Sequence, residues 1–316
     1  MRRAAAPARP ASRARTVPLE LPVRTLRSWL FVPGDSERKQ EKALASAADA
    51  VILDLEDSVA AAQQMRDAPA GGGPQLFVRA NAPASGLLTE DLEAVFAGGL
   101  PDGIVLPKVS AAGEVIEVAR RLAVLEQRAG GQAGGTRLLI IATETPAGVL
   151  SLPQYPATLG AVRALRERVA GLTWGAEDLG AALGARAQRD AAGALTFTFQ
   201  LARTHCLLAA AALGVQAIDG VCTEFRDPAR LQHELDAARR DGFSGKLAIH
   251  PDQIAAINAA FAPTDAEREH AERVVAAFAT APSAGVVSLD GRMIDRPHLL
   301  QAQRILAVAQ RLRDGT

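Results

Sequence analysis

Short apolar runs recur along the chain, and polar or turn-forming residues close each of them. Eight of these runs are rich in Val, Ile and Leu and are continuously apolar rather than alternating. They are SWLFVPG from Ser28, DAVILDLED from Asp49, QLFVRANA from Gln75, GIVLPKV from Gly103, RLLIIATET from Arg137, GLTWGAED from Gly171, VQAIDGVCT from Val215 and GKLAIHP from Gly245. A strand that is covered on both faces has this pattern, so we predict eight buried, parallel strands.

Stretches with helical periodicity separate most of these runs. In one of them Val115, Val118 and Leu122 recur at the spacing of a single helix face. We predict helices over residues 111–127, 198–213 and 228–240. Repeated strand–helix units are typical of a (β/α)8 TIM barrel, which places the chain in the α/β class. The connection over 61–74 is the weakest unit, because it becomes rich in Gly and Pro after a short helical stretch.

The two ends of the chain fall outside this alternation. The first segment, 1–24, is rich in Arg, Ala and Pro, which is typical of either a transit peptide or a disordered leader. We expect the barrel over 25–262 and a C-terminal extension over 263–316. In that extension, a helix over 265–280 and a final helix ending near residue 313 flank the stretch GVVSLDGRMIDRPH.

Composition narrows the class of protein. The 316 residues include 35 Lys and Arg against 35 Asp and Glu, so no charge excess favours a nucleic acid or a membrane surface as a partner. No apolar run reaches the length of about 20 residues that spans a bilayer. The two cysteines, Cys206 and Cys222, form no CxxC motif, which is typical of a reducing compartment and leads us to expect a cytoplasmic protein.

Almost every predicted strand ends in an ionisable residue. These residues are Asp35, Glu56 and Asp57, Arg79, Lys108, Glu144, Glu177 and Asp178, Asp219, and His250. In a TIM barrel the active site lies at the carboxyl ends of the strands. The sequence therefore predicts a charged active-site rim, and the acidic run after VILDL belongs to it.

Glu144 and Asp178 end the fifth and sixth runs, so neighbouring strands would bring them together. Two carboxylates offer hard oxygen ligands, which suit Mg²⁺. Salt bridges to Arg79 or Lys108 would explain the same pair, and the residues alone leave both possibilities open. Arg79 itself could hold a carboxylate or an enolate-like oxygen through its planar fork, or it could pair with the acidic run.

The first and eighth runs precede residues that could contact a ligand. After the first run, Gly34 breaks the strand, and Arg38 and Lys42 share one face near the start of a helix. This arrangement is typical of an anion site or of a solvated basic face. After the eighth run, His250 could contact a ligand or lie as a capped rim residue, and we expect Asp252 to cap the helix that follows.

Nine stretches, in order along residues 26–310, resemble the citrate lyase β-subunit-like (CitE-like) family of aldolases and acyl-CoA lyases. They are RSWLFVPGDSERKQEKA, ADAVILDLEDSVA, FVRANAP, DGIVLPKV, TETPAGV, LTWGAEDLG, AIDGVCTEFRDP, GKLAIHPDQI and DGRMIDRPHLLQA. Within the family the chain is most similar to citramalyl-CoA or malyl-CoA lyase-type members. It differs from the family pattern in the short segment between Val59 and Arg79 and in Ala80, where a branched apolar residue is usual.

The resemblance implies a TIM barrel that binds Mg²⁺ and cleaves a 3-hydroxyacyl-CoA, such as citramalyl-CoA or malyl-CoA, to acetyl-CoA and a 2-oxo acid. The residue roles that it implies are metal binding for Glu144 and Asp178, substrate binding and catalysis for Arg79, and acid/base catalysis for Asp295. In the mechanism that follows from these roles, we expect Glu56 and Asp57 to position Mg²⁺-bound water or Arg79. The residues that match stretches contacting the CoA thioester are Phe31, Pro33, Gly34, Arg38, Lys42, Ile249, His250 and Pro251.

The position of Asp295 bears on the assembly. Because it lies far beyond the eighth run, we expect it to reach the active site of a neighbouring chain in a homo-oligomer, either a trimer or a dimer of trimers. One alternative function is a citrate lyase β-subunit that acts on a citryl group carried by an acyl carrier protein. Another is a non-catalytic barrel subunit, and a third is a condensing enzyme that also hydrolyses the thioester. Since Glu144, Asp178 and Asp295 are all present, the sequence favours catalysis over a scaffold role.

Overall fold

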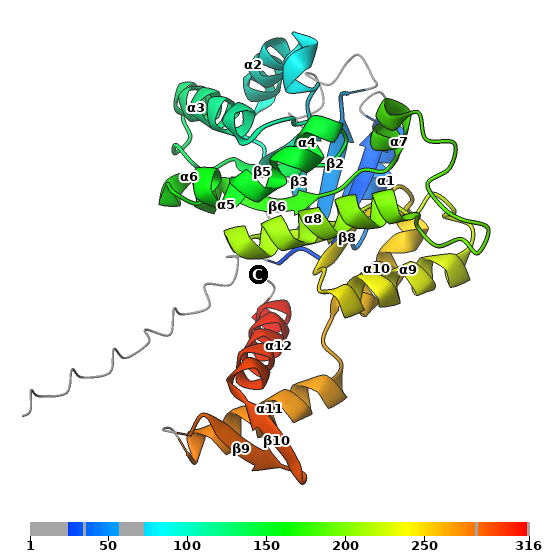
Figure 1. Ribbon diagram of the computed structural model, residues 1–316. Helices are drawn as coiled ribbons and strands as arrows, with labels where there is room; N and C mark the ends of the chain where they lie inside the picture. The colour runs from blue at the N-terminus through cyan, green and yellow to red at the C-terminus, as the bar shows by residue number, and fades with distance from the viewer. Residues whose placement is uncertain (1–24, 34–35, 57–72, 282–283, 315–316) are drawn as a thin grey trace, which may run out of the picture.

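The eight predicted strands form one closed barrel, in which each strand pairs in parallel with the next and β8 returns to β1 (Figure 1). The computed structural model describes residues 25–33, 36–56, 73–281 and 284–314. The barrel strands are β1 Ser28–Pro33, β2 Ala50–Asp54, β3 Gln75–Arg79, β4 Gly103–Leu106, β5 Arg137–Ile141, β6 Val169–Thr173, β7 Gln216–Asp219 and β8 Gly245–Ala248. The predicted (β/α)8 architecture is confirmed.

The strands are buried on both faces, which explains their uninterrupted apolar sequences. One set of side chains, including Trp29, Phe77 and Leu139, packs in one apolar cluster, and Trp29 meets Phe77 edge-on with the ring centroids 4.8 Å apart. The alternate residues, such as Leu30 and Val78, pack in a second cluster together with residues of the surrounding helices. Because all eight strands run parallel, their carboxyl ends meet at a single mouth.

Helices cover the outside of the barrel (Figure 1). They are α1 Glu37–Leu44, α2 Leu88–Gly98, α3 Ala112–Arg128, α4 Pro146–Ser151, α5 Tyr155–Leu159, α6 Arg163–Arg168, α7 Glu177–Leu183, α8 Phe197–Leu213, α9 Pro228–Asp241 and α10 Ile254–Phe261, with the short 3₁₀ segments η2 Pro83–Ser85, η3 Leu152–Gln154 and η4 Pro251–Gln253. The three predicted helices are confirmed as α3, α8 and α9. Most of the connection over 61–74 lies outside the described residues.

Local sequence signals place the ends of these helices. At the start of α9, the side chain of Asp227 accepts a hydrogen bond from the Arg230 N–H, and Pro228 takes the first helical position. Gly242, at φ 109°, ends the same helix in the left-handed conformation that glycine tolerates. Within the described part of the chain, no helix combines the length and the apolar character needed to cross a membrane.

The C-terminal residues form a separate unit with its own small core. It consists of α11 Asp265–Ala279, the antiparallel hairpin β9 Val286–Leu289 and β10 Arg292–Asp295, and α12 Arg296–Asp314. Val274, Phe278 and Ile294 belong to the apolar cluster that holds these elements together. In Figure 1 this unit extends away from the barrel, and its hairpin lies at the far end of the molecule from α4 and α7. The two predicted helices of the extension are confirmed.

Candidate active site

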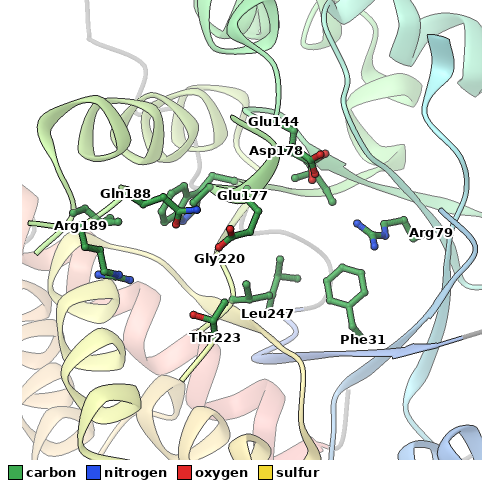
Figure 2. A pocket seen from close by; sticks show the side chains of 16 residues that line it. Phe31, Arg79, Glu144, Glu177, Asp178, Gln188, Arg189, Gly220, Thr223 and Leu247 are labelled. Atoms are coloured by element: carbon green, nitrogen blue, oxygen red, sulfur yellow. The ribbon is translucent and has the colours of Figure 1, made fainter. Parts of the chain in front are cut away.

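A cavity of about 270 Å³ opens at the carboxyl ends of the strands (Figure 2). Residues from β1, β3, β5 and β8, and from the segments that follow β5, β6 and β7, form its wall. The polar and charged side chains among them are Arg79, Glu144, Glu177, Asp178, Gln188, Arg189 and Thr223, and the larger apolar ones include Phe31, Ile141, Trp174 and Leu247. The predicted charged rim therefore encloses a real cavity.

Glu144 and Asp178 both line this cavity. Glu144 follows β5 and is only 5% exposed, whereas Asp178 lies in the first turn of α7, after β6, with a side chain 41% exposed. The neighbouring β5 and β6 bring them together, as the order of the runs predicted. A Cβ atom on Gly175 would lie 2.7 Å from Cγ of Glu144, so the chain after β6 can approach this carboxylate closely only because residue 175 is glycine.

The surroundings of Glu144 favour a bound cation. Burial raises the pKa of its carboxyl group to about 8, against the lowering effect of a hydrogen bond from the Lys108 N–H. The negative charges of Glu56 and Asp178 raise the pKa further, and the positive charge of Arg79 lowers it. A carboxylate in this setting is stabilised when a positive ion shares its site.

Arg79, at the end of β3, is fixed from two sides by carboxylates. Its Nε and Nη2 donate to the two oxygens of Asp54 at 2.7 and 2.5 Å, and its Nη1 lies 2.7 Å from Oε2 of Glu56. The guanidinium carbon lies 4.9 Å from the centroid of the Phe31 ring. Burial lowers the pKa of Arg79, but the paired Asp54 and Glu56 outweigh it and raise the pKa above its ordinary value. The side chain is therefore a permanent, rigidly held cation.

Lys108 connects Glu56 with the two acids of the cavity wall, Glu144 and Asp178. Its Nζ donates to Oε1 of Glu56 at 2.5 Å and lies 3.3 Å from Oδ1 of Asp178. Its backbone N–H donates to Oε2 of Glu144 at 2.6 Å. The sequence left open whether Glu144 and Asp178 bind a metal or pair with Arg79 or Lys108, and the structure contains an ion pair between Lys108 and Asp178.

These contacts define a carboxylate cluster whose charge suits a divalent cation. Its members are Asp54, Glu56, Arg79, Lys108, Glu144 and Asp178. When all four carboxylates are ionised, as metal binding requires, they outnumber the two cations and leave two negative charges among the described residues. All the available donors are oxygens, and Mg²⁺ prefers oxygen ligands and accepts few protein ligands beside water and substrate oxygens. Glu144 and Asp178 are the members that could hold such an ion at the cavity wall.

The residues expected to contact a CoA thioester lie on the adjoining part of the rim. Arg38 and Lys42 are exposed on α1, which follows β1, and Ile249 and His250 follow β8, the strand that pairs with β1. His250 stacks on Phe225 with the ring centroids 4.8 Å apart. Pro33, at the end of β1, and Pro251, in the segment after β8, are also exposed. Gly34 and Asp57 lie outside the described residues.

The expectation that Asp252 caps the helix after β8 is wrong. His250 is the capping residue, since its Nδ1 accepts from the Asp252 N–H at 3.3 Å. The side chain of Gln253 accepts from the His250 N–H in return, which completes a capping box. Asp252 instead lies inside the first turn, because Pro251 occupies the first position of the 3₁₀ segment.

Asp295 does not line the cavity of its own chain. It ends β10 in the C-terminal unit, where its Oδ1 lies 2.5 Å from Nδ1 of His298 and its side chain is 46% exposed. Figure 1 places β10 well away from the barrel mouth. Arg79, Glu144 and Asp178 therefore lie at one site, whereas Asp295 lies on the C-terminal unit.

Sequence reasoning missed several residues of this site. Asp54, the first acid of the VILDLED run, was not assigned a role, although it makes the closest contact with Arg79. Trp174 was visible in the motif LTWGAED, next to the recognised acid pair. Gln188 and Arg189 come from the connection between α7 and α8, which carries no periodic signal.

Comparison with known proteins identifies similar chains. The family model described as HpcH/HpaI aldolase/citrate lyase matches residues 27–251. A (3S)-malyl-CoA thioesterase from Cereibacter sphaeroides is 35% identical over 295 residues, covering 90% of this chain and 94% of that protein. The citrate lyase subunit beta of Escherichia coli is 35% identical over 298 residues, covering 91% and 94%.

A solved structure gives the same relationship. The crystal structure of CitE from Mycobacterium tuberculosis in complex with magnesium, acetoacetate and coenzyme A has a TM-score of 0.71 and 34% sequence identity. The match covers 90% of this chain and 98% of that one. Another structure, of the citrate lyase beta subunit of the same organism, holds oxaloacetate and magnesium, with a TM-score of 0.60 and 36% identity over 76% of this chain and 98% of that one. The resemblance noted in the sequence is confirmed.

Proposed function

Because this chain belongs to the HpcH/HpaI aldolase/citrate lyase family, we propose that it is a Mg²⁺-dependent carbon–carbon lyase of CoA thioesters. The observation that carries the proposal is the carboxylate cluster, which has two excess negative charges beside a cavity and a fixed arginine. Similar proteins have been crystallised with magnesium, coenzyme A and oxo acids, which supports the same ligands here.

The proposed substrate is a 3-hydroxyacyl-CoA such as citramalyl-CoA or malyl-CoA. The hydroxyl group releases its proton to solvent water, and its oxygen forms the carbonyl of a 2-oxo acid as the adjacent carbon–carbon bond breaks. The electron pair of that bond becomes the enolate of acetyl-CoA, which takes up a proton at carbon. The reverse sequence forms the bond.

The residues at the cavity have different roles in this reaction. Glu144 and Asp178 would hold Mg²⁺, which supplies the Lewis acidity that makes the substrate hydroxyl easier to deprotonate. Arg79 keeps its charge at every working pH and lies beside the same carboxylates, so it would bind the substrate carboxylate or the developing enolate oxygen. Asp54 and Glu56 hold the guanidinium in place from behind.

We assign the proton transfer at carbon to Asp295 of a neighbouring chain. Its exposed position on the C-terminal unit, away from the cavity of its own chain, supports this assignment. In cleavage it would protonate the enolate carbon, and in condensation it would remove that proton. The active assembly is then a homo-oligomer, a trimer or a dimer of trimers, with each site built from two chains.

The CoA portion of the substrate would lie across the β1 and β8 ends of the rim. Arg38 and Lys42 provide positive charge for the phosphates, and Ile249 and His250 provide an exposed surface beside them. A carrier-protein thioester would present the same pantetheine arm without the remote nucleotide phosphates.

Two other activities are supported by the relatives and form the alternative outcomes of one experiment. A thioesterase would release CoA and the intact hydroxy acid, as the name of the Cereibacter relative suggests. A citrate lyase β-subunit would need an acyl carrier protein. We would incubate the purified protein with malyl-CoA or citramalyl-CoA and Mg²⁺, and measure the 2-oxo acid, acetyl-CoA and free thiol separately.

The lyase predicts equal amounts of 2-oxo acid and acetyl-CoA with no free thiol, and EDTA should abolish both products. Free thiol without 2-oxo acid would replace the lyase with a thioesterase. Turnover that appears only after an acyl-carrier-protein thioester is supplied would make the chain a lyase subunit.

A further inference from the structure

Lys108 adopts a backbone conformation that is unusual for its residue type. Its φ angle is 52°, and among the described non-glycine residues only Asp290, in the β9–β10 turn, shares a positive φ. Such a conformation is strained for a residue with a side chain, and it persists where surrounding contacts fix it. Here it follows β4, directly at the barrel mouth.

The contacts of Lys108 explain why this conformation is kept. The backbone N–H donates to Glu144, while the ammonium group on the same residue reaches Glu56 and Asp178. One residue therefore touches three of the four carboxylates of the cluster. Glu56 is in turn the residue that faces Nη1 of Arg79. Lys108 therefore contacts both Glu144 and Asp178.

The ammonium charge also decides the total charge at the metal position. With Lys108 present and all four carboxylates ionised, the cluster carries two negative charges, which a divalent cation would cancel. Without Lys108 it would carry three, so the loaded site would stay negative. A substrate that arrives with its own carboxylate would then be repelled, although the cation itself would be held more tightly.

We propose that Lys108 is a positioning residue that balances the metal site: it lowers the affinity for the divalent cation and raises the affinity for the anionic acid half of the substrate. The inference rests on the proposed metal-dependent function and adds a residue to it. Lys108 acts here through Glu56, Asp178 and the cation that they surround, and its backbone N–H orients Glu144.

The experiment measures metal binding and acid binding directly, without turnover. Mn²⁺ serves as the metal probe in electron paramagnetic resonance titrations, and pyruvate serves as the 2-oxo acid probe, followed by water-proton relaxation of the Mn²⁺-loaded protein. The variants are Lys108→Met, which removes the charge, Lys108→Gly, which removes the charge and relaxes the backbone, and Lys108→Arg, which keeps the charge.

In Lys108→Met the dissociation constant for Mn²⁺ should fall about 15-fold, the order expected for one charge acting on a divalent ion about 5 Å away in a water-like dielectric. The dissociation constant for pyruvate should rise about fourfold, because a monoanion feels half that interaction. Lys108→Gly should show both shifts, and Lys108→Arg should restore both constants toward those of the wild type.

Weaker or unchanged Mn²⁺ binding in Lys108→Met would overturn the inference, and so would a shift in Lys108→Met that Lys108→Gly does not share. These outcomes are separate from the fate of the proposed reaction. A wild-type protein that binds Mn²⁺ and pyruvate but cleaves no thioester would refute the lyase and leave the assignment of Lys108 standing.

Discussion

Gly175 offers the sharpest test of the metal position, because its backbone packs closely against Glu144 and it has no side chain of its own. Its φ lies outside the left-handed region, so alanine can adopt the same backbone, and the substitution acts through volume alone. The new Cβ would lie 2.7 Å from Cγ and 3.1 Å from Oε1 of Glu144. Ordinary contact begins at 3.4 Å, so the carboxylate must retreat by at least 0.7 Å.

That displacement is large compared with the tolerance of a magnesium site. Distances from Mg²⁺ to its oxygen ligands stay within about 0.2 Å of their preferred values. We therefore expect Gly175→Ala to weaken metal binding about 10- to 100-fold, the range found when residues that orient ligands are changed. Overpacking at this position should also lower the free energy of unfolding by about 1–3 kcal/mol.

Gly180→Ala is the matched control. Gly180 lies in α7, the helix that carries Asp178, and its new Cβ would meet Phe199 at 3.6 Å, an ordinary contact. This variant should keep the metal affinity of the wild type and gain up to about 1 kcal/mol of stability, because alanine favours helix more than glycine does.

The assays are Mn²⁺ titration by electron paramagnetic resonance and urea unfolding in EDTA. EDTA keeps the stability of the metal-free protein separate from the effect of bound metal. If Gly175→Ala bound Mn²⁺ within about threefold of the wild type while Gly180→Ala behaved normally, Glu144 could not be the ligand that this geometry requires.

Three further predictions follow from other parts of the chain. Changing Arg38 and Lys42 together to Ala should raise KM for the CoA thioester about tenfold or more and leave a truncated thioester unaffected, because only the remote phosphates lose their partners; equal losses would point to a structural effect. Asp295→Ala and Glu144→Ala should each be nearly inactive, and mixed oligomers should regain activity if Asp295 acts in a neighbouring chain; no recovery after proven subunit exchange would contradict that assignment. Glu126, buried against an arginine, has a pKa below its ordinary value of 4.5, so its stabilising effect is present above pH 4.5 and is lost as pH falls through its lowered pKa. Glu126→Gln should cost about 3–5 kcal/mol in urea unfolding at pH 7, since the buried arginine loses its partner charge, and a cost below about 1 kcal/mol would contradict this.

The approximate positions of the strands were determined by the sequence itself. Burial on both faces demands an uninterrupted apolar run, and the end of such a run in a charged residue marks the barrel mouth. Because consecutive strands are neighbours in the barrel, the order of the runs was enough to predict that Glu144 and Asp178 lie on the same part of the barrel mouth. That both line one cavity follows from the order of their strands, which the sequence carries.

The pairing of charges at the mouth was decided by the tertiary structure. Asp54 and Glu56 lie on the same short run, and their spacing does not determine which of them pairs with which nitrogens of the Arg79 guanidinium. That choice depends on the register between β2 and β3, where Asp54 stands directly opposite Arg79. Register is a property of two strands together, so neither strand carries it alone.

The remaining features depend on contacts across long sequence separations. Lys108 keeps its left-handed backbone conformation through contacts with Glu56, Glu144 and Asp178. Each of these residues is far from Lys108 in sequence, so no local sequence pattern predicts the conformation. Gly175 could be recognised in the sequence only as a possible turn, whereas the folded chain presses it against Glu144. Local propensity and periodicity fix elements one at a time, but the charge balance of a site is set by groups that meet only when the barrel closes.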